Sequence, residues 1–143
     1  MHTASTWSGT ARPPSDGQTV EAVYAAAYDL LQRERYADAA GVFRLMLRIA
    51  RADDRGWLGL SECHERAGQS YLALEIITMG VLAGRLEARP SARCALARAR
   101  LLAKLDRDDE ATAAFDEARD LAEAAGDEPL LELVTREERR GAA

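Results

Sequence analysis

The chain has 143 residues, of which 48% are hydrophobic and 30% are charged, and its net charge is −5. A chain of this length forms one domain, and its richness in Ala, Leu, Arg and Glu favours helix over sheet. The excess negative charge lies in residues 101–143, which hold thirteen acidic and six basic residues. An acidic end argues against nucleic-acid binding, which needs clustered Lys and Arg, and is typical of a solvated helical face.

Cysteines and histidines are too few and too badly spaced for an obvious catalytic or metal site. Cys63 and Cys94 lie far apart without CxxC spacing, which predicts two buried thiols in a cytoplasmic protein. His2 and His64 are the only histidines, and His64 directly follows Cys63. Neighbours on a helix point about 100° apart, so these two cannot readily form a nucleophile–base pair. We expect no enzyme activity, no metal and no cofactor.

Residues 1–17 are rich in Ser, Thr and Gly, which predicts a flexible arm with Trp7 as its apolar anchor. This segment lacks the apolar core of a secretory signal, and no apolar run approaches the roughly 20 residues of a membrane span. Helix is expected from residue 18, with Thr19 as N-cap and Glu21 in the first turn. No alternating pattern indicates a strand before about residue 140, so the expected fold class is all-α.

The segment RYADAAGVFRLML at 35–47 has a pattern that returns along the chain. Ala39 and Ala73 are 34 residues apart, and so are Val23 and Trp57. This is the period of the tetratricopeptide repeat, a helix–turn–helix unit. Small residues let paired helices approach closely, and stacking covers the apolar face that each unit leaves bare. A helical bundle without repeats is the alternative.

Three such units in a right-handed superhelix are expected over residues 18–125. The second unit has the best-formed pattern, with Gly68 at its turn and Asp53 and Asp54 placed to cap its first helix. The residues expected to pack the repeats together are Tyr36, Ala39, Phe43, Trp57, Leu60, Gly68, Ala73, Ala111 and Phe115.

The first and third units depart from this pattern. Glu34 and Asp106 stand at the position that the turn glycine usually holds. The third unit also follows the second by 38 residues, which places about four extra residues within 78–91, near Gly84 or Pro90.

Residues 126–143 are expected to form a C-terminal capping helix and tail. Gly126 ends the preceding helix and Asp127 caps the new one. The apolar residues expected to pack inward are Leu130, Leu131 and Val134. Terminal repeats need such a polar-backed cap.

In a stack of this kind the first helices of the units line a concave groove, which one stripe of each helix faces. Tyr24 and Tyr28 would give it an aromatic end with large contact area and little rotamer cost. The groove suits an extended peptide with apolar anchors, although the two tyrosines could instead pack in an N-terminal or dimer contact. The expected lining residues are Glu21, Tyr24, Tyr28, Leu31, Arg55, Leu58, Glu62, Glu65, Arg93, Leu96, Arg100 and Lys104.

These segments resemble the class II chaperones of type III secretion, of the SycD/LcrH type. The resemblance covers about residues 18–125. Its sharpest part is Arg-x-Trp-Leu-Gly-Leu-x-x-Cys at 55–63, and the family's Tyr-x-x-Ala-x-x-x-Phe begins at Tyr36. The chain departs from the family in two places. The entry to the third unit reads Glu-Ala-Arg-Pro-Ser-Ala-Arg after an insertion, and Leu96 and Ala97 replace the third unit's aromatic groove residues.

The resemblance implies a non-enzymatic chaperone of the bacterial cytoplasm that holds hydrophobic translocators before secretion. Such proteins bind a short N-terminal stretch of the client in the concave groove, and a homodimer through the N-terminal helices is implied as well. Neither nucleic-acid binding nor membrane insertion is expected. The alternative function is a repeat adaptor that joins folded proteins in regulation or assembly, and a helical enzyme is a weaker third.

Overall fold

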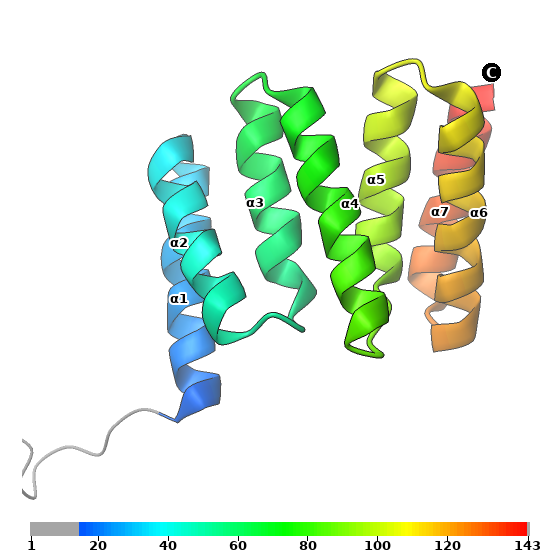
Figure 1. The fold of residues 1–143 in the computed structure, drawn as a ribbon. Helices are drawn as coiled ribbons and strands as arrows, with labels where there is room; N and C mark the ends of the chain where they lie inside the picture. Colours follow the sequence, from blue (N-terminus) through cyan, green and yellow to red (C-terminus); the bar gives the residue numbers. More distant parts are fainter. Residues whose placement is uncertain (1–14, 143) are drawn as a thin grey trace, which may run out of the picture.

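The structure is a computed structural model that describes residues 15–142. Within them the helices, in chain order, are α1 Asp16–Gln32, α2 Tyr36–Ile49, α3 Asp54–Arg66, α4 Ser70–Leu86, α5 Ala92–Lys104, α6 Asp108–Ala125 and α7 Glu128–Ala142. Figure 1 shows three antiparallel pairs side by side, with α7 against the last pair. The predicted all-α fold of helix pairs and a closing helix is confirmed. Most of the predicted arm, with Trp7, lies outside the described residues.

The turns inside the three pairs share one backbone conformation. Glu34, Gly68 and Asp106 have φ values of 60°, 82° and 57°. This left-handed region costs a non-glycine residue about 1 kcal/mol, and the residues occupy the equivalent positions that the repeat spacing predicts. Gly68 itself is exposed, and nothing lies within 4 Å of the place a Cβ would take. Its assignment to repeat packing is wrong, because its backbone conformation explains its place in the turn.

The first helix of each pair begins at a side-chain cap. Ser15 caps α1 because its Oγ accepts from Gln18 N at 3.1 Å while Gln18 Oε1 accepts from Ser15 N at 2.8 Å. This reciprocal capping box satisfies two free backbone donors. The prediction of Thr19 as N-cap is therefore wrong, and α1 begins inside the predicted arm. The other capping residues are Asp53 for α3, Ser91 for α5 and Asp127 for α7.

The extra residues before the third unit lengthen α4. This helix has 17 residues where α2 has 14, and the loop at 87–91 is one residue longer than the loop at 50–53. The insertion thus adds nearly one helical turn at the end of α4. Gly84 lets the loop fold back on this turn, since a Cβ there would lie 2.9 Å from Arg89 O.

Two buried clusters form the core, one around α1 to α3 and one from α4 to α7. Trp57 packs against both clusters. Phe43 is buried against α3, where a Cβ at Gly59 would lie 2.1 Å from its Cε1. In α7 it is Val134 that is buried, with partly buried Leu130 and Leu133 beside it. Leu131 lines a pocket with polar neighbours, so its predicted inward packing is wrong.

Candidate functional site: the concave face

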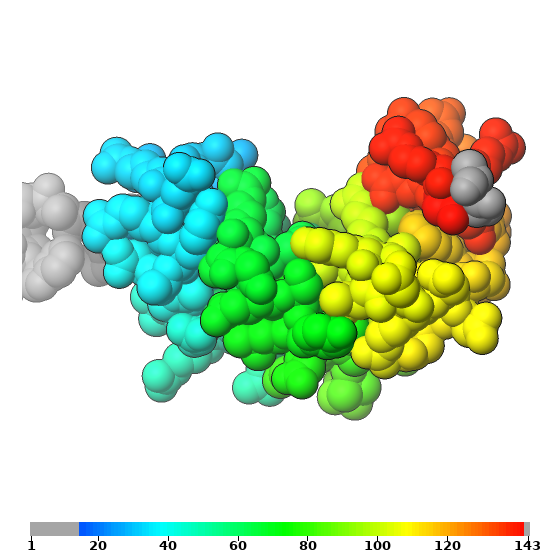
Figure 2. Space-filling model, turned by 90° about the horizontal axis from the view of Figure 1, so that it is seen from above, coloured from blue at the N-terminus to red at the C-terminus, as the bar shows by residue number. Residues whose placement is uncertain are grey.

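The first helix of each pair lies on the inner side of a curve. The backbones of α1 and α3, of α3 and α5, and of α5 and α7 approach one another in series, whereas within residues 15–142 no Cα atom of α2, α4 or α6 lies within 8 Å of another of these three helices. The outer helices α4 and α6 meet through the side-chain ion pair of Arg85 and Glu117. The inner helices are therefore closer together than the outer ones, and Figure 2 shows the hollow that results between the N-terminal pairs and α7. This is the concave face on which the groove was predicted.

A pocket of about 320 Å³ opens between α3 and α5 on this face. Predicted groove residues from both helices share it. Its lining residues are Leu58, Ser61, Glu62, Glu65, Arg66, Ala97, Arg100 and Leu101. Apolar side chains mixed with charged ones suit an anchor residue of a bound peptide together with polar contacts around it.

The two tyrosines at the α1 end differ in their surroundings. Their ring centroids are 6.0 Å apart. Tyr24 is partly buried, lies 6.4 Å from the Phe43 ring and has the guanidinium carbon of Arg55 4.4 Å from its centroid. Tyr28 is 48% exposed. The structure therefore leaves Tyr28 available for a ligand and uses most of the Tyr24 ring for packing.

Arg55 is held by two carboxylates as well as by the ring. Its Nη2 lies 2.6 Å from Glu21 Oε2 and 2.7 Å from Asp53 Oδ2. Hydrogen bonds from Arg55 lower the pKa of both carboxyl groups, and the same bonds raise the pKa of Arg55. Arg55, which was predicted to face a ligand, thus links α3 to α1.

Ion pairs of this kind continue across the whole concave face. Arg93 pairs with Asp54 at 2.5 Å and Lys104 with Glu65 at 3.2 Å, joining α5 to α3. Arg100 Nε lies 2.5 Å from Glu137 Oε2, joining α5 to α7. Each pair spans 34 to 39 residues, about one repeat. Charges paired in this way contribute modestly to stability but fix the groove before a ligand arrives.

Two predicted groove residues are buried instead. Leu31 and Leu96 are each only 2% exposed. Leu31 belongs to the cluster that contains Ala27 and Phe43. Leu96 belongs to the other buried cluster, which also contains Val134 of α7. Their assignment to the groove is wrong, because an apolar side chain at the edge of the stripe gains more from burial between helices than from facing water.

Glu137 is a groove residue that the sequence reasoning missed. Its carboxylate faces Arg100, whose hydrogen bonds lower the pKa of Glu137. The omission came from treating α7 as a cap alone. The signal that could have found it is an opposite charge one repeat after a groove residue, as in Glu21 and Arg55.

The site offers little for covalent chemistry. Burial raises the pKa of the Cys63 and Cys94 thiols to about 11, and both cysteines are free. His64 Nδ1 lies 2.7 Å from Gln69 Oε1. Over residues 15–142 no group of three His, Cys, Asp or Glu could hold a metal ion. Nor does this part of the chain contain a helix long and apolar enough to span a bilayer.

The stacked helix pairs are similar to those of a class of secretion chaperones. In sequence and fold the chain is similar to the translocator chaperones of type III secretion, which confirms the resemblance seen in the sequence. No family model matches the chain.

Low calcium response locus protein H of Yersinia pestis is 31% identical over 86 residues, which are 58% of this chain, and the match spans only 51% of that relative. PcrH from Pseudomonas aeruginosa has a TM-score of 0.75 at 26% identity, over 92% of this chain and 97% of PcrH.

The translocator chaperone SycD from Yersinia enterocolitica has a TM-score of 0.73 at 26% identity, over 88% of this chain and 90% of SycD. PcrH in complex with the chaperone binding region of PopB has a TM-score of 0.71 at 27% identity, over 88% of this chain and 98% of PcrH.

Proposed function

We propose that this protein is a non-enzymatic chaperone of the bacterial cytoplasm that keeps a hydrophobic translocator of a type III secretion system soluble. It holds a short extended segment of the client in the concave groove. The observation that carries the proposal is this groove, with half-exposed Tyr28 at one end and the pocket between α3 and α5, on the fold of PcrH, whose complex contains the chaperone binding region of PopB.

The groove favours a short extended segment over a folded client. Tyr28 supplies an exposed aromatic surface, and partly exposed Leu58 and Ala97 supply apolar contact in the pocket. The ion pairs around them are already formed, so little side-chain ordering is needed on binding. Anchoring a short motif also leaves the rest of the client unfolded, and a client with membrane-inserting segments aggregates in water unless it is held.

The division of the chain follows from the same proposal. Residues 18–125 hold the binding repeats, and α7 after them closes the stack while Glu137 completes one edge of the groove. A homodimer through the N-terminal helices belongs to the proposal as well. It is supported by α1, an end helix whose Ala22, Ala25 and Ala26 are exposed and would let another helix approach closely.

Co-expression with the hydrophobic translocator of the same organism tests the proposal. We expect the translocator to stay in the soluble fraction and to copurify with this protein. A translocator that is insoluble both with and without this protein, with no complex recovered, contradicts the proposal. A folded regulatory protein recovered in its place would favour the adaptor function.

A further inference from the structure

A second pocket lies on the outer side of the curve, away from the groove. It has a volume of about 430 Å³ and is formed where α2 and α4 end. Most of the side chains that line it are apolar. Its lining residues are Leu47, Arg48, Arg51, Trp57, Met79, Leu82, Ala83, Leu86 and Glu87.

The extra turn of α4 and a close helix contact build this pocket. Gly80 lets Trp57 lie against α4, since a Cβ at Gly80 would lie 2.7 Å from Trp57 Cβ. Leu86, in the added turn, is 77% exposed, and Met79 and Leu82 are exposed on the same helix. Large apolar side chains that gather around a pocket mark an interaction surface.

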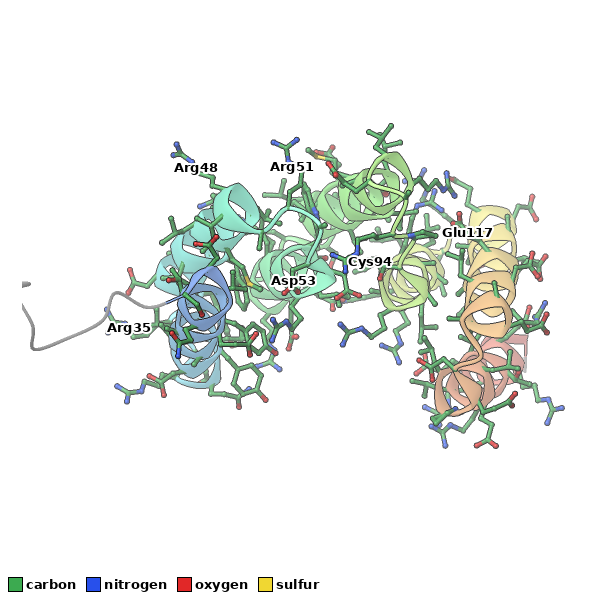
Figure 3. The ribbon with its side chains drawn as sticks, turned by 90° about the horizontal axis from the view of Figure 1, so that it is seen from below. Arg35, Arg48, Arg51, Asp53, Cys94 and Glu117 are labelled. Carbon is green, nitrogen blue, oxygen red and sulfur yellow. The ribbon has the colours of Figure 1, made fainter. Side chains whose placement is uncertain are left out.

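The charge around the pocket is unbalanced. Arg48 and Arg51 line it, and neither forms an ion pair with any residue in 15–142, whereas Arg55, Arg93 and Arg100 of the concave face are all paired. Figure 3 shows Arg48 and Arg51 projecting from the outer side. Glu87 is the one carboxylate among the lining residues.

We propose that this outer pocket binds an acidic amphipathic helix of a partner protein. Its apolar face would place anchors against Trp57 and Leu82, and its carboxylates would pair with Arg48 and Arg51. Anchors at helical spacing in an apolar groove, with opposite charges at the rim, are a general mode of peptide recognition. The surface is separate from the concave groove, so it provides a second interaction beyond the proposed function.

Charge argues against the two occupants that this chain could itself provide. A second copy placed by two-fold symmetry would bring the same patch, with its own Arg48 and Arg51, against the first. Residues 1–14 contain Arg12 and no acidic residue, so they cannot neutralise the arginines.

Fluorescence can test the proposal because the chain has only two tryptophans. In a full-length Trp7→Phe variant, Trp57 reports directly on the pocket. The probe is a 15-residue peptide with leucines at i, i+3, i+4 and i+7 spacing and glutamates elsewhere, and its control has lysines in place of the glutamates. We expect the acidic peptide to change Trp57 emission and to bind at least about tenfold more tightly than the lysine peptide.

Variants then locate the site. Arg48→Glu with Arg51→Glu should weaken the acidic peptide about tenfold and reverse the preference between the peptides. Arg139→Glu with Arg140→Glu makes the same change in net charge on α7 and should leave affinity unchanged. Leu82→Glu should abolish binding of the acidic peptide. Tyr28→Ala should not change this binding, because Tyr28 lies in the concave groove and not at the outer pocket.

Several results would overturn the proposal. One is equal binding of the two peptides, and another is unchanged affinity in the Arg48 and Arg51 double variant. A tenfold rise in affinity on replacing Trp7 by Ala would identify residues 1–14 as the occupant. A dimer in sedimentation that Leu82→Glu converts to a monomer would identify a second copy.

Discussion

The guanidinium carbon of Arg55 lies 4.4 Å from the centre of the Tyr24 ring, and the same guanidinium is hydrogen bonded to Glu21 and Asp53. A cation over an aromatic face contributes about 0.5–1 kcal/mol at an exposed site and more when water is excluded. This contact ties α1 to α3 and separates the roles of two tyrosines that the sequence predicts as one aromatic pair.

Tyr28→Ala should therefore weaken client binding without loss of stability. Tyr28 is half exposed, so its removal should reduce affinity about tenfold and change the free energy of unfolding by less than about 0.5 kcal/mol. Calorimetric titration with the client segment and urea unfolding measure the two effects. Tyr71→Ala on α4 is the matched control, since Tyr71 is 69% exposed and should affect neither.

Tyr24→Ala should behave differently from Tyr28→Ala. It removes packing against Phe43 and Arg55, so we expect it to lower the free energy of unfolding by about 1–3 kcal/mol. If Tyr24→Ala left stability unchanged while Tyr28→Ala lowered it, the assignment of the two rings would be reversed.

Arg55→Met should make stability less sensitive to acid. The folded-state pKa values of Glu21 and Asp53 lie below their ordinary values of 4.5 and 3.8, because Arg55 donates hydrogen bonds to both. Their stabilising contribution is present above the ordinary values and is lost as the pH falls through the lowered ones. Urea unfolding from pH 6 to pH 3 should thus show a shallower fall for Arg55→Met than for the wild type.

A control separates this effect from a general change in charge. Arg89→Met removes an exposed arginine that has no ion pair within residues 15–142, and it should keep the wild-type pH dependence. An identical fall in all three proteins would show that the Arg55 cluster does not contribute to acid sensitivity.

Periodicity predicted the fold better than the groove. The repeat pattern located the turns at Glu34, Gly68 and Asp106 despite the extra residues before the third unit, because each repeat needs the same left-handed residue there. The groove depends instead on small rotations that decide whether a side chain at the edge of a stripe faces water or a neighbour. Leu31 and Leu96 turned inward for this reason, and no pattern within a single helix indicates it.

Glu34→Gly should stabilise the protein. Glu34 holds φ 60°, which costs a residue with a Cβ about 1 kcal/mol, while the added freedom of glycine in the unfolded chain removes part of that gain. We expect the free energy of unfolding, measured by thermal or urea unfolding, to increase by about 0.5 kcal/mol in total. Gly68→Ala is the reverse change at the equivalent turn and should cost about 1 kcal/mol. If Glu34→Gly lowered the free energy of unfolding and Gly68→Ala raised it, the left-handed turns would not limit stability.

Gly59→Ala should be among the most damaging single changes, although it adds only a methyl group. The new Cβ would lie 2.1 Å from Phe43 Cε1, and Phe43 is fully buried between α2 and α3. Either the ring must leave its rotamer or the helices must separate, which costs about 1–3 kcal/mol in a well-packed core. Because α3 also carries Arg55 and Leu58, the shift should weaken client binding too.

Gly41→Ala is the matched control for this change. Gly41 lies on the exposed side of α2, with nothing within 4 Å of the added Cβ. There the substitution only raises helix propensity, so it should stabilise by about 0.5–1 kcal/mol and leave binding unchanged. Circular dichroism melts of the two variants measure the contrast. A Gly59→Ala variant as stable as Gly41→Ala would mean that α2 and α3 are not in the close contact that sets the curve of the groove.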